Sequence, residues 1–377
     1  MPCRYPPGAG IVKELLQNAD DAGATVFKIC LDKRSWPSGG DLFDPAMSSF
    51  LGPALLCFND SVFNNDDVNA ILRPGNSSKA NDMSKTGKFG LGFNSVYHIT
   101  DMPSFLTIDK IFYLDPHKRY LPKKLSTGMR RSNYEYKFTT AAKLEKSQGS
   151  WRPFDRGTSG VRWLPDIASQ QEFQGSLFRL PFRPNDHESE LFETGKGAWS
   201  DEKTMQSFAQ FYKDIVVASL FLKSVKDIEI LVWETDEPQP KLVYGAKTSV
   251  GAADLPASRS MPDLLREKKK LLTALLQASK SPQKAFETNY ACTVATKVAD
   301  VSGFFEACAT IKNPIAGLQT GESSFDYVVT RRLGIDSSEV MREAYRKAQV
   351  YAASRSAAAN AQGVKIEKFT HLPLVSV

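Results

Sequence analysis

The segment Ile11–Ala24, which reads IVKELLQNADDAGA, restricts the local fold more than any other part of the 377-residue chain. Plotted at 100° per residue, its apolar side chains fall on one arc, which predicts an amphipathic helix packed on a core. Lys13, Gln17 and Asp20 fall opposite that arc, and we expect Asp20 to be the solvent-facing acid. Gly23 follows at a position where a glycine commonly ends a helix.

A third, narrow arc of this helix holds Glu14, Asn18 and Asp21, at positions i, i+4 and i+7, without a Lys or Arg among them. One interpretation is a hydrated strip on the surface of an amphipathic helix. The other is that carboxylate and amide oxygens converge on a water molecule or on a hard cation such as Mg²⁺. The helix alone leaves both interpretations open.

A glycine cluster further along the chain is the second informative feature. Gly87, Gly90 and Gly92 have the spacing GxxGxG, and residues 93–99 are expected to be helical. Glycines at a helix N-terminus let the backbone approach a phosphate, which the free N–H groups and the helix dipole stabilise. A glycine-rich surface turn is the alternative. The polar segment 76–85 is either a lid that brings Lys79 or Lys85 near phosphates or an ordinary loop.

Better-known phosphate-binding patterns do not occur in the sequence. It contains no GxxxxGK[ST], no HRD or DFG triplet, and no strand that leads directly into the glycines as in a dinucleotide-binding fold. Between the helix and the glycines, residues 54–58 are expected to form a buried strand. Asn59 and Asp60 stand at its end, where a ligand-binding pair and a simple turn are both plausible.

Composition limits the class of partner and the compartment. The net charge of +6 is spread over 48 basic and 42 acidic residues, which suits a nucleotide as well as a nucleic acid. The five cysteines form no CxxC pair, and Cys30 and Cys57 lie in apolar runs, as expected for core thiols in a reducing compartment. Without an apolar run of 18 residues, we expect a soluble, cytoplasmic protein with no membrane partner.

Three features together resemble the GHKL ATPase superfamily, which includes gyrase, histidine kinases and a heat-shock chaperone. In chain order, they are ELxxNADDA, a strand that ends in ND, and GxFGxGFxS. Within this superfamily, the chain is specifically similar to sacsin repeats over roughly residues 5–235. The segments that carry this similarity are KELLQNADDAGAT, GKFGLGFNSVYHITDMPSF, LDPH and GSLFRLPFR. The resemblance implies an α+β protein with a Bergerat fold, an α/β sandwich in which helices cover one face of a mixed, largely antiparallel sheet. We place this ATP-binding domain at residues 1–245 and a C-terminal α/β extension at residues 246–377.

The resemblance also assigns roles to individual residues. Glu14 matches the general base and Asn18 the Mg²⁺ ligand, while the segment before the glycines matches a lid over ATP. The other implied nucleotide-binding residues are Asp21, which supports the pocket, Asp60 or its neighbour Asn59 at the adenine, Lys79 of the lid, Gly87, Phe89, Gly90, Gly92 and Phe93 of the phosphate box, and Ser176, which replaces a threonine.

The resemblance implies an ATP-binding module with weak Mg²⁺-dependent hydrolysis that acts on client or co-chaperone proteins in folding or quality control, and it allows a dimer. Two departures favour an alternative, a degenerate nucleotide-binding or purely structural interaction module. The family pattern DxGxG is replaced by residues 59–63 without a glycine, and only about ten residues precede the first helix, as in a short domain or a fragment. A nucleic-acid-associated relative is a third hypothesis that rests only on the net charge, and we expect no nucleic acid.

Overall fold

The computed structural model describes residues 8–37, 41–72, 92–121, 133–137, 148–155, 164, 172–183, 189, 199–250, 286–299 and 320–333. Residues 264–277 and 339–361, for which the sequence pattern also predicts helices, lie outside these ranges. Gly23 follows the first helix with a φ of +79°, and its N–H donates to the carbonyl of Asp20, as expected for a glycine that ends a helix.

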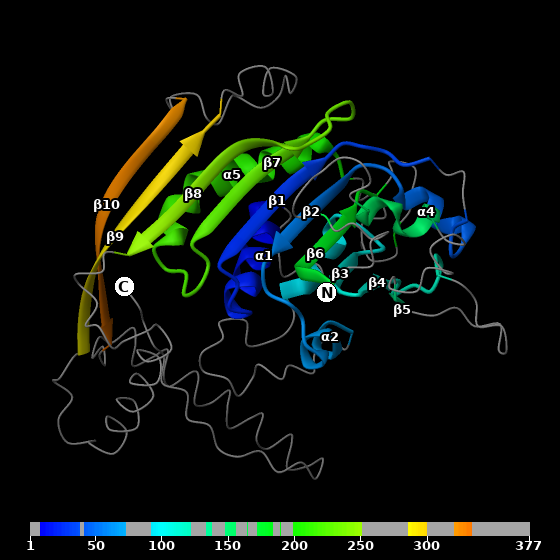
Figure 1. The fold of residues 1–377 in the computed structure, drawn as a ribbon, viewed down its shortest axis with the longest axis horizontal. Helices are drawn as coiled ribbons and strands as arrows, with labels where there is room; N and C mark the ends of the chain where they lie inside the picture. The colour runs from blue at the N-terminus through cyan, green and yellow to red at the C-terminus, as the bar shows by residue number, and fades with distance from the viewer. Residues whose placement is uncertain are drawn as a thin grey trace, which may run out of the picture. The chain divides into compact units, whose positions relative to one another are not determined.

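The described chain is built on one sheet with the strand order β10-β9-β8-β7-β1-β2-β6-β3-β4-β5 (Figure 1). β1 and β7 pair in parallel, whereas the pairs β1–β2, β2–β6, β6–β3, β3–β4, β4–β5 and β7–β8 are antiparallel. The sheet is therefore mixed and largely antiparallel, which confirms the expected fold class. The strands are β1 (Val26–Asp32), β2 (Ala54–Asn59), β3 (Ser104–Ile108), β4 (Lys110–Leu114), β5 (Asn133–Lys137), β6 (Phe173–Pro181), β7 (Asp227–Trp233), β8 (Lys241–Val250), β9 (Phe286–Val298) and β10 (Gly321–Leu333).

Helices of two lengths accompany the sheet. The first helix forms where the apolar arc predicts it, and the segment after the glycine cluster is helical but of the tighter 3-10 type. The α-helices are α1 (Ala9–Asp21), α2 (Asn65–Leu72), α4 (Gln148–Trp151) and α5 (Asp201–Ser219), and the 3-10 helices are η2 (Pro45–Phe50), η4 (Gly92–His98) and η6 (Arg152–Phe154).

Every residue of β2 is buried, so both faces of the sheet are covered at its centre. On one face, the ring of Phe93 from η4 packs on Phe178 of β6, with the ring centroids 5.6 Å apart. η4 in turn packs against α1, and α1 packs against α5. The long helices and the segment after the glycine cluster therefore lie together on one face of the sheet, as the resemblance implies.

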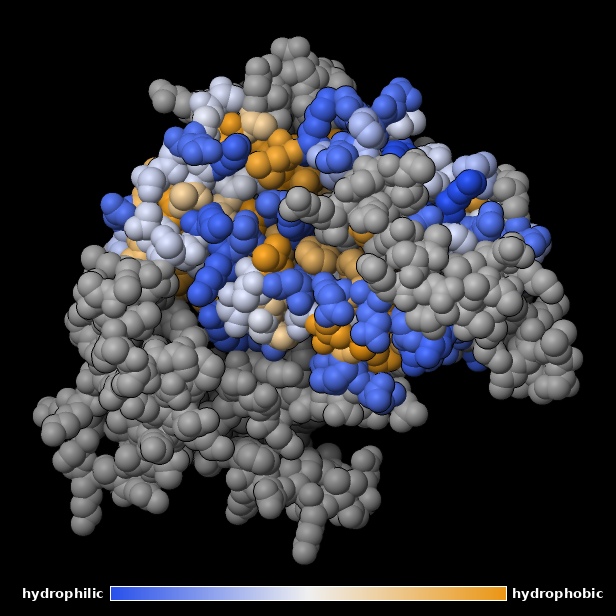
Figure 2. All heavy atoms as spheres, in the orientation of Figure 1, coloured by the Kyte–Doolittle hydropathy of each residue, from blue (hydrophilic) through white to orange (hydrophobic). Residues whose placement is uncertain are grey.

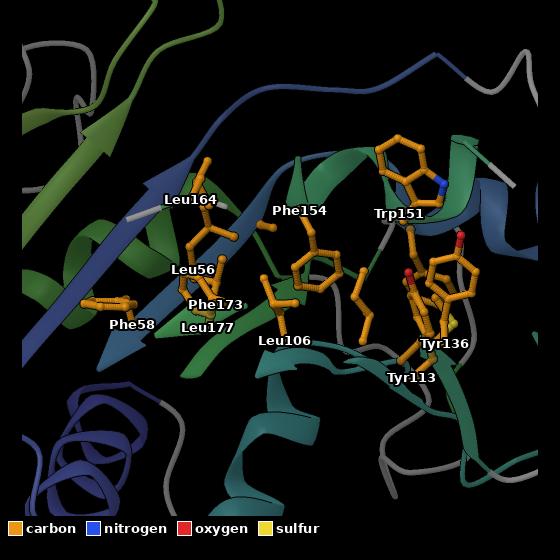
Figure 3. Packing of buried hydrophobic residues seen from close by; sticks show 14 of the residues in the cluster. Leu56, Phe58, Leu106, Tyr113, Tyr136, Trp151, Phe154, Leu164, Phe173 and Leu177 are labelled. Atoms are coloured by element: carbon orange, nitrogen blue, oxygen red, sulfur yellow. The ribbon is translucent and has the colours of Figure 1, made fainter. Parts of the chain in front are cut away.

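The opposite face carries a second core that is rich in aromatic residues (Figure 3). Tyr113 of β4 donates its hydroxyl proton to the carbonyl of Ser150, and its ring packs edge-on against Phe154 of η6. Trp151 and Phe50 bury their side chains in the same core, so the short helices α4, η6 and η2 cover this face. These short helices have no periodic signal in the sequence because each spans only one or two turns.

The thiols of Cys30 and Cys57 are fully buried in β1 and β2, as expected for core cysteines. By internal contacts the chain divides into two compact units, Met1–Ser249 with Thr293–Phe325, and Val250–Cys292 with Asp326–Val377. The strand ladder of the sheet continues through β8 beyond residue 245, where we propose the domain boundary from the sequence.

Candidate functional site

Glu14 and Gly92, from the two most informative sequence features, are in contact. A Cβ atom built on Gly92 would collide with Oε2 of Glu14 and lie 3.1 Å from its Cδ. The carboxylate occupies the space that any other residue at position 92 would fill, so a glycine is required there while Glu14 keeps this position. The fold thus brings the acidic strip of α1 to the end of the glycine cluster.

The carboxylate of Glu14 is half-buried, and no described residue forms a hydrogen bond or ion pair with it. Burial raises its pKa above the ordinary value of 4.5, because desolvation penalises the charged form. A raised pKa makes Glu14 a stronger base than an exposed glutamate, which is the property that proton abstraction from water requires.

Asn18 lies one helical turn after Glu14, and its side chain is half-buried. Its backbone carbonyl accepts the N–H of Ala22, but its side-chain amide bonds to no described residue and is available as an oxygen ligand. Among the described residues, no group of three or more His, Cys, Asp or Glu side chains could hold a metal ion. The amide oxygen of Asn18 could serve as one protein ligand of a cation such as Mg²⁺, which often takes its other ligands from phosphates and water.

The third member of the strip is tied to another part of the fold. The carboxylate of Asp21 is enclosed and pairs with Nζ of Lys223 at 2.8 Å, in the connection between α5 and β7. Lys79, Gly87, Phe89 and Gly90 lie outside the described residues.

Asp20 is not the solvent-facing acid that the helical projection predicts. It is 6% exposed, and its carboxylate accepts the backbone N–H groups of Lys223, Ser224 and Val225 at 2.7–3.1 Å. The projection was wrong because it treats α1 in isolation, whereas the turn before β7 packs against the last turn of α1. A polar side chain opposite the apolar arc is buried there by a segment about 200 residues away.

Asp20→Ala is expected to lower the free energy of unfolding by about 2–3 kcal/mol, because three backbone N–H groups lose a charged acceptor in a buried turn. Denaturant unfolding of the chain, followed by circular dichroism, measures the change. Asp214→Ala, which removes an exposed ion pair with Lys13, is the control and should have little effect. Equal stability of the two variants would show that the turn does not depend on Asp20.

At the end of β2, the carboxylate of Asp60 is used within the protein. It accepts the N–H groups of Thr25 and Val26 at 2.7 and 3.0 Å, and the Thr25 hydroxyl at 2.5 Å. These bonds fasten the residues after β2 to the start of β1. Ser61 adds a further link by donating its hydroxyl proton to the carbonyl of Ala22, at the end of α1.

Asn59 and Ser176 are direct cross-strand neighbours in β2 and β6, and Thr107 of β3 faces Ser176 from the other side. All three are buried and form a polar row across the sheet. Because side chains alternate along a strand, Ser176 shares its face with Phe178, which is the face that carries η4 and α1. Sequence reasoning did not identify Thr107, because a threonine in a strand has no distinctive pattern.

A buried ion pair, also not predicted, holds the segment after the glycine cluster in place. Arg183, just after β6, pairs with Asp101 at 2.6 Å, and both side chains are at most 1% exposed. The same guanidinium donates to the carbonyl of Tyr97 in η4 at 2.7 Å, and Ser189 donates to Asp101. The arginine that ends GSLFRLPFR and the aspartate of HITD are therefore structural partners that position η4.

The Sacsin domain family model matches residues 3–245, which is more than half of the chain. The chain belongs to the Sacsin domain family. It is 35% identical to human sacsin over 253 residues, which are 66% of this chain and 5% of the length of human sacsin. It is also similar to the B-subunit of DNA gyrase from Myxococcus xanthus, with 9% identity, a TM-score of 0.30 and coverage of 84% of this chain and 77% of that one. A likeness that low carries no information about activity.

Two further observations concern the described part of this Sacsin domain chain. None of its described helices has the length and apolarity to cross a bilayer. On the face shown in Figure 2, hydrophobic residues occur in small areas bordered by hydrophilic ones. His98, the last residue of η4, is buried.

Proposed function

We propose that this Sacsin domain chain binds a purine nucleoside triphosphate with Mg²⁺ and hydrolyses it weakly, with ATP as the nucleotide that the family resemblance implies. The observation that carries the proposal is the contact between Glu14 and Gly92. At this contact, the half-buried carboxylate of Glu14, which has no ion-pair partner among the described residues, lies against the backbone of a glycine. On the same strip of α1, the side-chain amide of Asn18 offers an oxygen to a metal ion.

In this proposal, Glu14 takes a proton from the water that attacks the terminal phosphate. Asn18, four residues further on, supplies the protein oxygen to Mg²⁺, and the ion when bound neutralises the phosphate charge. Lys223 keeps Asp21 fixed at the end of the same helix, so α1 presents its two reactive positions on a rigid element. Burial of Glu14 raises its pKa, which makes it a better proton acceptor.

At the other end of the site, we propose that Asn59 rather than Asp60 faces the base. Asp60 already accepts three hydrogen bonds from Thr25 and Val26, whereas Asn59 belongs to the polar row with Ser176 on the face toward η4. The biological role that we propose is in chaperone-type protein folding or quality control, through client or co-chaperone proteins and with a dimer as one state. The cytoplasm is the proposed compartment.

A specific observation favours an alternative, a module that binds nucleotide or protein without turnover. Residues 61–63 are held down by internal hydrogen bonds, since Ser61 accepts from Ser176 and Phe63 donates to Thr107. A loop fastened in this way resists the adjustment that productive binding of a nucleotide demands.

Isothermal titration calorimetry of the 377-residue chain with nucleoside triphosphates and Mg²⁺ tests the proposal. We expect Kd values of about 1–100 µM, within the range of ordinary small-ligand affinities, and slow phosphate release in a coupled assay. Binding without phosphate release would establish the alternative module. Absence of binding by both ATP and GTP would overturn the nucleotide-binding function itself.

A further inference from the structure

The two edges of the sheet differ in how they are protected against another strand. One edge is β5, which has only five residues and carries two ion pairs, Lys110 with Glu135 and Lys137 with Asp109. Short strands and charged side chains are common means of keeping an edge from pairing with a second chain. The other edge is β10, which has 13 residues and no proline, and the only described strand beside it is β9 (Figure 1). A long edge of this kind is a template for strand addition.

Phe325 is a large apolar side chain that β10 leaves in water. Glu322 pairs with Lys297 of β9 at 3.2 Å, so the even-numbered residues of β10 share the face of Lys297. The odd-numbered residues face the other way, and they include Phe325 and Tyr327. Phe325 is 44% exposed, an unusual state for a phenylalanine inside a strand. Another strand laid along the edge would cover part of this ring.

The charges of β10 are divided by sign between its two halves. Glu322 and Asp326 belong to the first half of the strand, and Arg331 and Arg332 belong to the second. A copy of the same strand that runs antiparallel therefore sets the acidic half of each against the basic half of the other. A parallel copy would set acidic residues beside acidic ones and basic residues beside basic ones. Because like charges directly opposite one another are destabilising, β10 is complementary to itself only in the antiparallel orientation.

Pairing over the whole strand also fixes which residues meet. Tyr327 is the middle one of the 13 residues, so a two-fold axis at Tyr327 lets every residue of β10 pair. In this register Glu322 stands opposite Arg332, and Phe325 stands opposite Val329. Symmetry repeats each pair, which gives two opposite-charge pairs on one face and two aromatic–β-branched pairs on the other. Both kinds of pair stabilise antiparallel strands.

We propose that β10 is the surface through which two copies of this chain dimerise, by antiparallel pairing of their edge strands into one continuous sheet. The proposal specifies the dimer that the proposed function includes as one state. It does not require nucleotide, so a failure to bind ATP would leave it standing. A single pair of strands forms a small interface, and we expect the dimer to be in reversible equilibrium with the monomer.

Sedimentation velocity of the 377-residue chain without nucleotide, at about 1–100 µM, measures the association. Glu322→Arg and Arg332→Glu should each weaken dimerisation roughly tenfold, because each variant sets two like-charge pairs against one another. An equimolar mixture of the two variants should dimerise as the unmodified chain does, since every cross-strand pair again joins an arginine to a glutamate. Glu237→Arg makes the same charge change at an exposed ion pair outside β10 and should leave the association unchanged.

Cysteine cross-linking tests the same register without altering charge. Tyr327→Cys places two thiols at the two-fold axis, where opposite Cα atoms lie about 4.5–5.5 Å apart, within the reach of a disulfide. Mild oxidation should therefore give a linked dimer on a non-reducing gel. Ser323→Cys is the control, because the two copies of position 323 lie roughly 27 Å apart along the paired strands. The unmodified chain gives the background from its five native cysteines.

The existence of the dimer and its register can fail separately. A chain that stays monomeric at about 100 µM would overturn the proposal, and so would a dimer that neither charge variant weakens. Circular dichroism verifies that the variants are folded, and the two cysteine variants decide the question if a charge variant is not. A mixture of the charge variants that stays monomeric, or equal cross-linking at positions 323 and 327, would overturn the antiparallel register.

Discussion

Replacement of Glu14 by Gln is expected to lower the rate of phosphate release by at least about 100-fold, while the Kd for the nucleotide changes little. The amide has the shape of the carboxylate but cannot take a proton from water, and general-base catalysis typically contributes two to four orders of magnitude. Steady-state phosphate release at saturating nucleotide and Mg²⁺ measures the rate, and calorimetry measures binding. Glu135→Gln, on an exposed part of β5, is the matched control.

The pH dependence supplies an independent test of the same role. Because burial raises the pKa of Glu14 above 4.5, the rate should decline, as the pH is lowered, before an ordinary glutamate would protonate. The raised pKa affects folding stability in the opposite direction. A carboxyl group whose pKa is higher in the folded state than in the unfolded state contributes stability at low pH, and this contribution is lost as the pH rises through the folded-state pKa. Glu14→Gln should therefore not destabilise the chain at neutral pH.

A second substitution tests the geometry around Glu14 rather than its chemistry. Gly92→Ala places a methyl group against the carboxylate and forces the flexible side chain of Glu14 to move. We expect phosphate release to fall while the fold is retained. If Glu14→Gln and Gly92→Ala both release phosphate at the rate of the unmodified chain, Glu14 is not the general base.

Arg183→Met should be among the most destabilising single substitutions in the described part of the chain, at about 3–5 kcal/mol. Methionine fills much of the same volume, but Asp101 would keep a buried charge without its partner, and the carbonyl of Tyr97 would lose a donor. Urea unfolding followed by tryptophan fluorescence provides the measurement. The exposed pair of Lys241 with Glu237 offers the control, and Lys241→Met should change the midpoint little.

The double variant Arg183→Met with Asp101→Asn separates lost charge pairing from lost packing. Neutralising Asp101 removes the unpaired buried charge, so the double variant should be more stable than Arg183→Met alone. If the double variant is the less stable of the two, the two side chains contribute independently and the ion pair is not what positions η4.

Local patterns were sufficient to predict several elements of the fold. The apolar arc of α1, the glycine after it and the continuous apolar run of β2 each specify an element from neighbours in sequence, and each is confirmed. The short helices on the opposite face of the sheet were not predicted, because one or two turns carry too little periodicity and Phe50, Trp151 and Phe154 become a core only when strands distant in sequence meet them.

Local sequence specifies which residue types are available: an acid and an amide four residues apart on α1, and a glycine cluster able to approach a phosphate. How these residues are used depends on the packing of distant segments. This packing placed Glu14 against Gly92 and buried Asp20 under a turn about 200 residues away. It also committed Asp60 to Thr25 and left Asn59 as the polar group in the row with Ser176. The physical reason is that helix and strand periodicity depends on neighbours along the chain, whereas burial and hydrogen-bond partners depend on which distant segments pack together.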